Sequence, residues 1–457
     1  MSKLMKSVSG IRGIVGESLT VNNVLNFAQR FGVYCNNSKV LIGRDSRTTG
    51  KMLFNAISAG LMSVDCDVVD LGICPTPTIL LAVENSNASG GIAITASHNP
   101  KEWNALKLIS GKGTFLTSLQ AKQFWSIKND EIINQNWHNI GKLSSDNSAI
   151  ENHINSIIQL KYIDLDAIRK KNFKVVIDST NGAGGLLSPK LLRKLGCNVI
   201  ELFSEPTGIF SRIAEPSAEN LKELERQVIS EKADIGFATD PDVDRLSIVS
   251  EEGKALGTEF SLLLAEDYVL SQNKVTQLSQ LRNIATNLSS SMASEDIAKK
   301  YGVQVFRSKV GEINVAEMMK QHNCVIGGEG NGGIIIPDLH FTRDAPMGMA
   351  LILSYMAKTK KRISELANLI PDYFMNKTKL QLTDNINFDE RLIQIKNKFP
   401  NCKFDFTDGM KIIAKDYWIH IRKSGTEPVV RIISESESRE KSKNLINSIR
   451  KLLKPDL

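Results

Sequence analysis

The sequence is poor in the features that mark extracellular scaffolds and membrane proteins. Its six cysteines never fall in a CxxC or other ligand spacing, and its six histidines do not cluster along the chain. Scattered cysteines in a chain of 457 residues indicate reduced, mostly packed thiols in a reducing compartment. The first ten residues lack the apolar core of a signal peptide, and no apolar run is long enough to cross a membrane. We therefore expect a cytoplasmic protein without a membrane partner.

Charge of either sign is present without a strong excess. Lys plus Arg number 57 and Asp plus Glu 50, and no basic tract concentrates the positive charge. This pattern is typical of a well-solvated surface, so we expect no nucleic-acid partner. With 42% hydrophobic and 23% charged residues, the composition is that of an ordinary globular protein, which excludes collagen, a disordered chain and a disulfide scaffold.

Short apolar strands alternate with longer amphipathic stretches, which predicts an α/β protein with a largely parallel sheet in each unit. This alternation of strands and helices begins at residues 39–45 and begins again at residues 173–178 and 283–286. The last stretch instead predicts a meander of strands followed by an amphipathic helix over residues 439–453. The expected domains are residues 1–150, 151–252, 253–368 and 369–457.

One chemistry-bearing motif follows the predicted strand at residues 91–94. It reads Thr95-Ala96-Ser97-His98-Asn99-Pro100. A serine at the carboxyl end of a parallel strand lies where open α/β sheets bind their ligands. Pro100 disfavours a helix at Asn99, so the motif indicates a tight exposed turn. By itself it is compatible with a nucleophile or with a simple Ser/Thr turn.

A second motif places three carboxylates at alternate positions, in Asp240-Pro241-Asp242-Val243-Asp244-Arg245. Carboxylate oxygens that converge in this way suit a hard divalent cation such as Mg²⁺ or Ca²⁺. An EF-hand is excluded because Arg245 stands where that loop requires glycine. A solvated acidic turn is the alternative, but Pro241 and Val243 favour a shaped loop.

Two further loops offer polar and cationic groups. Residues 327–333 are glycine-rich and contain Glu329 and Asn331; because an isoleucine-rich run follows, they predict a hairpin turn or a sugar-binding loop and not a Rossmann helix start. Residues 422–428 combine two cations, two hydroxyls and a glycine, which predicts a phosphate-binding nest or, alternatively, a plain surface turn.

Taken together, the four loops resemble those of the α-D-phosphohexomutase family, whose members interconvert 1-phospho and 6-phospho sugars. The matching motifs occur in the family's order over essentially the whole chain: TASHNP, DPDVDR, GEGNGG and RKSGTEP. The resemblance implies a heart-shaped α/β protein of four domains, three similar α/β domains and a smaller C-terminal α+β domain like the TATA-binding protein. It also implies an enzyme that passes a phosphoryl group from a serine to the sugar and takes the other phosphate back, through a 1,6-bisphosphate.

The resemblance further implies a role for each candidate residue. One Mg²⁺ per chain would be held by the phosphoserine position and the three carboxylates, that is by Ser97, Asp240, Asp242 and Asp244. The other expected catalytic residues are Arg12, His98, Lys107 and Arg245, with His98 and Lys107 as proton handlers or charge partners. The residues expected to bind the sugar are Lys309, Glu329 and Asn331. Those expected to bind the non-reacting phosphate are Arg422, Ser424, Gly425, Thr426 and Arg431. A hexose 1,6-bisphosphate is the expected activator.

Departures from the family pattern concern the sugar. Gly333 stands where many members carry a histidine, and His340 and Arg343 are candidates to take its place. The GEGNGG form is similar to phosphoglucosamine mutases and to the archaeal-type phosphoglucomutase/phosphomannomutase branch. We therefore expect glucosamine phosphate as the small-molecule substrate, with mannose or glucose phosphate as the alternative, and a monomer or homodimer.

Two hypotheses lie outside the mutase class. A phosphatase could use the same serine and Mg²⁺, but it would leave the sugar loop and the phosphate nest without a purpose. A catalytically inactive sugar-phosphate sensor is disfavoured because Ser97 and all three aspartates are present.

Overall fold

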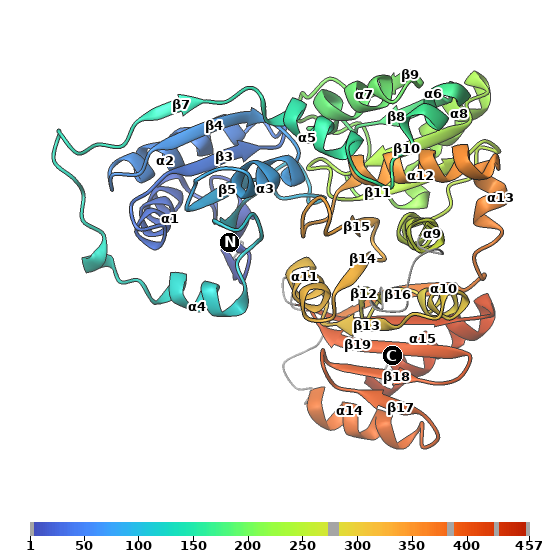
Figure 1. Cartoon of the computed structure of the whole chain (residues 1–457). Coiled ribbons are helices and arrows are strands. Elements are labelled where there is room, and N and C mark those ends of the chain that lie inside the picture. Colours follow the sequence, from blue (N-terminus) through green and yellow to red (C-terminus); the bar gives the residue numbers. More distant parts are fainter. Residues whose placement is uncertain (1–3, 273–282, 382–387, 425–428, 454–457) are drawn as a thin grey trace.

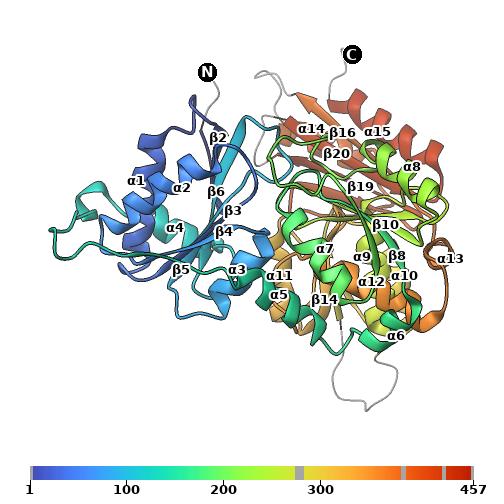
Figure 2. The same cartoon turned by 90° about the horizontal axis from the view of Figure 1, so that it is seen from above.

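The computed structural model describes residues 4–272, 283–381, 388–424 and 429–453, which form four sheets in four consecutive parts of the chain. Figure 1 shows the first part, in blue and cyan, set apart on one side, while the other three are stacked on the other side. The view from above in Figure 2 shows the same separation. We refer to these units as the first to fourth parts.

The first part contains a seven-stranded mixed sheet in the order β1-β2-β6-β5-β3-β4-β7. Its elements are β1 (Met5–Ser7), β2 (Gly10–Ile14), α1 (Val21–Tyr34), β3 (Val40–Arg44), α2 (Gly50–Met62), β4 (Val68–Ile73), α3 (Thr76–Glu84), β5 (Gly90–Ile94), β6 (Trp103–Ser110), α4 (Ser118–Ser126), η1 (Asn129–Glu131) and β7 (Leu143–Ser145). The prediction of a largely parallel sheet is wrong here, since β1, β2 and β6 run antiparallel to their neighbours. The physical reason is the connection from β5 to β6, because residues 95–102 are too few for a crossover between parallel strands.

The second and third parts each contain a four-stranded sheet. The elements of the second part are α5 (Ala149–Ile158), α6 (Leu165–Lys171), β8 (Lys174–Asp178), α7 (Gly184–Lys194), β9 (Asn198–Leu202), η2 (Ala218–Asn220), α8 (Lys222–Glu231), β10 (Ile235–Thr239) and β11 (Leu246–Ser250). Those of the third part are α9 (Thr258–Ser271), β12 (Asn283–Asn287), α10 (Ala293–Tyr301), β13 (Val305–Ser308), α11 (Glu312–Gln321), β14 (Cys324–Glu329), β15 (Gly333–Ile335), α12 (Ala345–Thr359) and α13 (Ile363–Ala367).

The first three parts share one sheet topology, which confirms the expectation of three similar α/β units. The corresponding strand orders are β6-β5-β3-β4, β11-β10-β8-β9 and β15-β14-β12-β13. Among these four strands of each unit, the third along the chain (β5, β10 or β14) is followed directly by an antiparallel strand. The loops at these three connections carry Ser97, the three aspartates and the glycine-rich run, so the sequence motifs occupy one equivalent position in all three units.

The second and third parts share one hydrophobic core. A single cluster of buried side chains extends from Ile154 to Ile370. Helix α12 lies at its centre, in contact with α5, α6, α7 and α9, and its residues from Ala345 to Ala357 are all buried. This placement explains why α12 is apolar on all sides, because each face meets another helix.

The fourth part is an antiparallel five-stranded sheet in the order β16-β20-β19-β18-β17. Its elements are β16 (Phe374–Gln381), α14 (Phe388–Asn397), β17 (Lys403–Asp405), β18 (Met410–Ile413), β19 (Tyr417–Lys423), β20 (Val429–Ser436) and α15 (Arg439–Leu453). The predicted meander and the predicted helix are confirmed. Helix α15 packs on β16 and β20, with Ile446, Ile449 and Leu453 in the core of this part.

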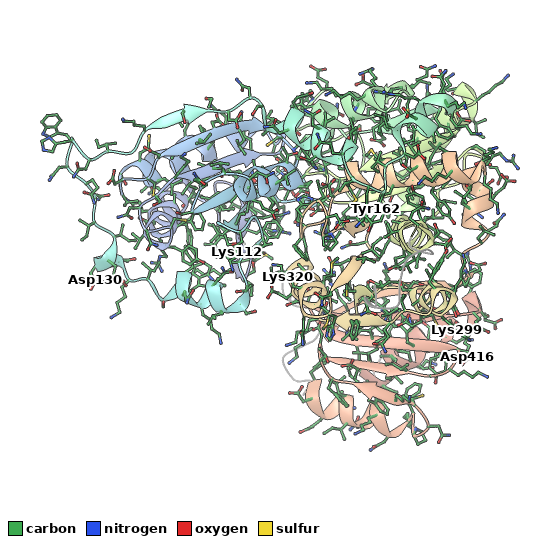
Figure 3. All side chains as sticks on the ribbon, viewed as in Figure 1. Lys112, Asp130, Tyr162, Lys299, Lys320 and Asp416 are labelled. Atoms are coloured by element: carbon green, nitrogen blue, oxygen red, sulfur yellow. The ribbon has the colours of Figure 1, made fainter. Side chains whose placement is uncertain are left out.

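The surface and the thiols agree with the composition. Figure 3 shows charged side chains spread over the molecule, with Lys112 and Asp130 exposed on the first part and Lys299 on the third, whereas Tyr162 is only 2% exposed. All six cysteines are free thiols, and every one except Cys402 is buried. Among the described residues, no helix combines the length and the apolar character that a membrane span requires.

Candidate active site

The loop after β5 presents Ser97 in a backbone conformation that few residues adopt. Ser97 has a φ of 49°, in the left-handed region. Its backbone N–H donates to Thr95 Oγ1 at 2.9 Å, and Thr95 Oγ1 donates to Asp45 Oδ2 at 2.6 Å. A strained conformation of this kind persists only where the surroundings enforce it, which is common at functional sites.

Arg47 fixes the shape of the same loop. Its side chain and that of Asp45 are fully buried, and Nε lies 3.1 Å from Asp45 Oδ2. Its two terminal nitrogens donate, over 2.6 to 3.0 Å, to the backbone carbonyls of Ser97, Asn99, Pro100 and Trp103. The sequence analysis missed Arg47 and Asp45, although charged residues directly after the apolar strand β3 were a signal that could have found them.

The loop between β10 and β11 buries three carboxylates side by side. Asp240, Asp242 and Asp244 are at most 1% exposed, and one oxygen of each lies within 4.8 Å of the others. Val243, between them, has a φ of 66°, which is unusual for a β-branched residue. The loop therefore has the enforced backbone of a functional turn, as the Ser97 loop does.

The electrostatics of this loop favour a bound cation. Burial and the charges of Asp244 and Asp242 raise the pKa of Asp240 well above its usual value. Burial acts in the same direction on Asp242, but the charge of Lys107 together with the hydrogen bonds from Asp240, Lys107 and Thr76 outweighs it and lowers the pKa of that carboxyl. Asp242 Oδ1 and Asp244 Oδ1 are buried and accept no hydrogen bond from the described residues. An oxygen donor set with unsatisfied buried atoms fits a hard divalent ion such as Mg²⁺.

The structure brings the predicted nucleophile and the predicted metal loop into contact. Ser97 Oγ donates a hydrogen bond of 2.7 Å to Asp240 Oδ2, across the boundary between the first and second parts. Thr76, the first residue of α3, donates through Oγ1 to Asp242 Oδ2 at 2.8 Å. The loop that follows β10 is thus joined to the first part by the side chains of Ser97 and Thr76, and also by that of Lys107.

Three of the predicted cations surround this contact. Lys107 Nζ lies 2.7 Å from Asp242 Oδ2 and 3.8 Å from Asp244 Oδ2. Although burial opposes it, the charges of these two carboxylates raise the pKa of Lys107, so this side chain is an ammonium group. Arg12 donates to Asn99 Oδ1 at 2.6 Å, and Arg245 Nε lies 3.7 Å from Asp244 Oδ1.

His98 is placed to exchange a proton at Ser97. Its Nδ1 lies 3.4 Å from Ser97 Oγ. The charge of Arg245, followed by burial and the charge of Arg12, lowers the pKa of His98 well below its usual value. The imidazole is therefore neutral near pH 7 and able to accept a proton.

Arg343 connects the aspartate loop to the glycine-rich loop of residues 327–333. Its Nη2 lies 2.6 Å from Asp244 Oδ2, its Nη1 3.0 Å from Glu329 Oε2 and its Nε 3.1 Å from Glu312 Oε2. Glu329 also accepts from Asn287 Nδ2 at 2.7 Å and from the Gly311 N–H at 2.9 Å. Burial raises the pKa of Glu329, but the charge of Arg343 and the hydrogen bonds from Gly311 and Asn287 together outweigh it, so the pKa is lowered and the group is a carboxylate.

Gly333 makes room for this arginine. A Cβ atom added at Gly333 would overlap Cδ of Arg343, so a larger residue there requires the arginine to move. Of the two candidates to replace the missing histidine, Arg343 lies against this position. His340 does not, because its Nε2 bonds to Asp344 Oδ2 at 2.9 Å.

The contacts continue into the fourth part through Asp408. Its Oδ2 accepts from the Val310 N–H at 3.1 Å and from Arg422 Nε at 3.0 Å. Val310 follows Lys309, which is exposed at the carboxyl end of β13. Arg431 lies opposite Arg422 in the pairing of β19 and β20. The sequence analysis did not single out Asp408.

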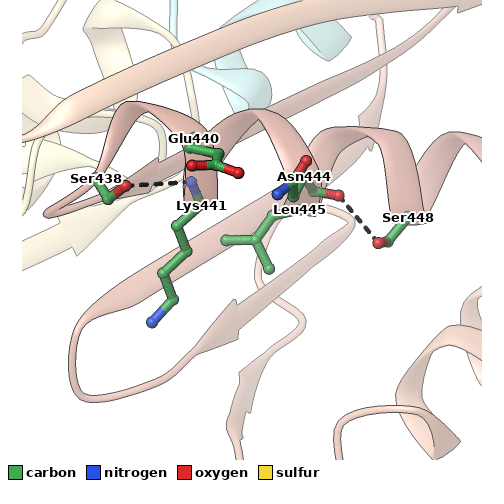
Figure 4. A pocket seen from close by; sticks show the side chains of 6 residues that line it. All are labelled: Ser438, Glu440, Lys441, Asn444, Leu445 and Ser448. Atoms are coloured by element: carbon green, nitrogen blue, oxygen red, sulfur yellow. Dashed lines mark hydrogen bonds between the residues drawn. The ribbon is translucent and has the colours of Figure 1, made fainter.

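The remaining members of the predicted phosphate nest are only partly described. The Ser424 N–H, directly after β19, donates to the carbonyl of Val429, the first residue of β20, at 2.8 Å. Gly425 and Thr426 lie outside the described residues. The hollow on the outer face of α15 in Figure 4, lined by Ser438, Lys441 and Ser448 among others, shares no residue with the site.

Comparison with known proteins agrees with this arrangement. The models of the phosphoglucomutase/phosphomannomutase α/β/α domains I, II and III match residues 3–133, 151–253 and 258–373, and that of the C-terminal domain matches residues 378–452. The chain therefore belongs to the phosphoglucomutase/phosphomannomutase family of phosphohexomutases, which are isomerases, as its motifs predicted.

Several curated relatives match over the whole chain. The phosphoglucomutase/phosphomannomutase of Thermococcus kodakarensis is 38% identical, covering 98% of both chains. A probable phosphoglucosamine mutase of Methanopyrus kandleri is 35% identical, covering 96% of this chain and 95% of the relative. The phosphoglucosamine/phosphogalactosamine mutase of Sulfurisphaera tokodaii is 34% identical, covering 99% of both chains.

Among solved structures, a phosphoglucomutase/phosphomannomutase family protein from Burkholderia thailandensis superposes with a TM-score of 0.84 at 24% identity, covering 99% of this chain and 98% of that one. This likeness supports the four-part fold.

Proposed function

We propose that this phosphohexomutase interconverts glucosamine 6-phosphate and glucosamine 1-phosphate, with Ser97 as the phosphoryl carrier and a 1,6-bisphosphate as intermediate. The observation that carries the proposal is the contact of Ser97 Oγ with Asp240, within a carboxylate loop that has unsatisfied oxygens. Asp240, Asp242 and Asp244 would hold Mg²⁺, whose charge would neutralise the transferring phosphoryl group.

In the first half-reaction, the P–O bond to Ser97 Oγ breaks while a bond forms from phosphorus to the free hydroxyl oxygen of the sugar phosphate. The hydroxyl proton passes to a base, and neutral His98 is suited to accept it. The bisphosphate then reorients within the site, so that its other phosphoryl group faces Ser97. That phosphoryl group passes to Ser97 Oγ, and the proton returns to the sugar oxygen that the phosphoryl group leaves. Arg47 keeps Ser97 in one position throughout, which such a transfer requires because it depends on positioning.

The sugar would be read by the glycine-rich loop together with Lys309. Glu329 is an ionised acceptor for hydroxyl or ammonium groups, and Asn331 Nδ2 makes only a long bond of 3.4 Å to it. That bond is the easiest to exchange for one to a ligand. Arg422, Ser424, Gly425, Thr426 and Arg431 would bind the phosphate that does not react, since guanidinium groups match phosphate oxygens.

Glucosamine phosphate is favoured because the GEGNGG loop and several relatives named as phosphoglucosamine mutases agree on it. The competing substrates are glucose and mannose phosphates, which the name of the Thermococcus kodakarensis relative at 38% identity supports. Asp-bound Mg²⁺ and a hexose 1,6-bisphosphate activator belong to either alternative.

A mutase assay with Mg²⁺ and catalytic hexose 1,6-bisphosphate tests the proposal, comparing glucosamine, glucose and mannose 6-phosphates. We expect the highest kcat/KM for glucosamine phosphate and a loss of at least about 10⁴-fold in Ser97→Ala. Ser448→Ala, on the outer face of α15, is the matched control and should retain activity. A lead for glucose or mannose phosphate overturns the substrate, and release of inorganic phosphate without isomerisation indicates a phosphatase.

A further inference from the structure

A second cluster of potential metal ligands lies away from the active-site carboxylates, where the first three parts meet. It consists of His153 on α5, His340 before α12 and Asp344 at the start of α12. His153 Nε2 lies 2.7 Å and His340 Nε2 2.9 Å from the same atom, Asp344 Oδ2. The six histidines are scattered along the sequence, so only folding brings these two together.

We propose that His153, His340 and Asp344 bind one divalent transition-metal ion, with Zn²⁺ as the favoured species. The donor set separates this site from the aspartate loop, because imidazole nitrogens suit Zn²⁺ whereas Mg²⁺ takes oxygen ligands. Ligand bonds of about 2.1 Å in tetrahedral geometry hold donor atoms roughly 3.4 Å apart. The three donor atoms already lie within 4.8 Å of one another, so small side-chain movements are sufficient.

Burial and charge support an ion at this place. All three side chains are at most 1% exposed. Within the described residues, the ion pairs of Asp344 involve only these two imidazoles, and no lysine or arginine reaches it. A buried carboxylate without a permanent cation is costly, and a divalent ion would supply the missing charge.

The ligands are also held from behind, as metal ligands usually are. His153 Nδ1 lies 2.8 Å from the Oγ1 of Thr78 on α3. When Nε2 binds an ion, Nδ1–H can donate a hydrogen bond to this hydroxyl oxygen. Asp344 Oδ1 accepts from the Met347 N–H at 2.8 Å, which fixes the carboxylate at the N-terminus of α12.

A cavity lies beside one member of the cluster. His153 contributes to the lining of a cavity of about 510 Å³ between α3, β4 and α5. The ion would connect the second part to the third, and through Thr78 to the first. Because Arg343 precedes Asp344, it would also anchor the residue that contacts Asp244 and Glu329.

The test uses the full-length protein, freed of metal by chelation and titrated with Co²⁺ while excess Mg²⁺ occupies the aspartate loop. We expect one equivalent to bind with the intense visible absorption of a low-coordinate nitrogen-ligated site, Zn²⁺ to displace it, and Zn²⁺ to raise Tm by about 5 °C or more. No Co²⁺ binding under these conditions overturns the proposal.

Variants locate the ion. His153→Gln and His340→Gln should each weaken binding by at least roughly 100-fold, and Thr78→Val, which removes the outer hydrogen bond, by roughly 10- to 100-fold. His322→Gln, a histidine stacked on Phe306, and Asp242→Asn should both retain the ion. Unchanged affinity in the first two variants, or loss in Asp242→Asn, overturns the assignment. Should the glutamine variants not fold, X-ray absorption of the Zn²⁺-loaded wild type decides, because two imidazole ligands support the site and an all-oxygen shell contradicts it.

Discussion

At the scale of single residues, Arg343 is the side chain that several carboxylates of the site share. It contacts Asp244 of the aspartate loop, Glu329 of the glycine-rich loop and Glu312, the first residue of α11. Although burial lowers it, these charges hold the pKa of Arg343 well above its usual value, so the guanidinium is permanently charged. Arg343 therefore sets the position of Glu329, which we expect to bind the sugar, relative to the aspartates.

Replacement of Arg343 should damage both catalysis and stability. Arg343→Lys keeps the charge but cannot reach three partners, and we expect kcat/KM to fall about 10²-fold. Arg343→Met takes the ion-pair partner from the buried carboxylates of Glu312 and Glu329, and should cost about 3–5 kcal/mol of unfolding free energy. Steady-state kinetics and urea unfolding measure the two effects.

Gly333→Ala provides the matched comparison, since its added Cβ meets the same arginine. It should reproduce the direction of the Arg343→Lys defect without any change of charge. Wild-type kcat/KM in Gly333→Ala would show that the space at Gly333 is not what positions Arg343.

At the scale of elements, the Ser97 loop depends on a residue from a different strand end. Arg47, which follows β3, binds four carbonyls of the segment between β5 and β6. The shape of the loop therefore depends on hydrogen bonds from the Arg47 guanidinium group, in addition to contacts within the loop itself. That arrangement allows Ser97 to keep a left-handed backbone without a glycine.

Arg47→Ala should release this loop. We expect kcat to fall about 10²-fold because the nucleophile loses its position, with a smaller change in KM. Arg44→Ala is the control, because the Arg44 side chain contacts Asp70 at 3.5 Å and the Phe54 ring and makes none of the contacts to the Ser97 loop that Arg47 makes, so kcat should change little. Equal kinetic losses in the two variants would contradict the specific role of Arg47.

The motifs of the site were predictable from the sequence, but the charged residues that hold these motifs in position were not. Ser97, the three aspartates and Glu329 belong to short runs whose residue types state their chemistry. Arg47, Arg343 and Asp408 are single charges whose meaning depends on partners up to about a hundred positions away, as with Arg343 and Asp244. The mixed first sheet was missed because periodicity does not reveal strand direction. The roles of the catalytic and binding residues stay predictions until the assays above are made.

At the scale of the whole molecule, the parts are joined in two ways. The second and third share a core through α12, whereas the third and fourth meet through polar contacts. At the latter boundary, His420 Nε2 donates to the Asp408 carbonyl at 2.6 Å and Nδ1 accepts from the Ser289 hydroxyl at 2.8 Å. Burial lowers the pKa of His420 to about 4.

This boundary should weaken in acid. The unfolded chain protonates His420 near its ordinary pKa of about 6.5, whereas the folded chain does so only near 4, so protons favour unfolding below pH 6.5. The expected loss of stability is about 3 kcal/mol at pH 4. Melting curves between pH 7 and pH 4 should show a shallower decline in His420→Asn than in the wild type, and equal slopes would exclude His420 as the cause.

The shared core predicts that the second and third parts unfold together. Leu353→Ala in α12 removes a fully buried side chain and should cost about 2–5 kcal/mol. Hydrogen exchange should then show the same loss of protection in β8 and β12, with the fourth part unaffected. A loss confined to one of these two strands would mean that the cluster is not one cooperative unit.

The loops between β5 and β6, β10 and β11, and β14 and β15 limit which sequence changes this protein can tolerate. Each of the three loops that carry the predicted site residues is held at both ends by neighbouring antiparallel strands, so an insertion there would displace those residues. New sugar preferences therefore have to come from exchanges of side chains, such as the pairing of a glycine at 333 with an arginine at 343. Added length will be tolerated elsewhere, for example between η1 and β7, where the chain runs along the outside of the first part (Figure 1).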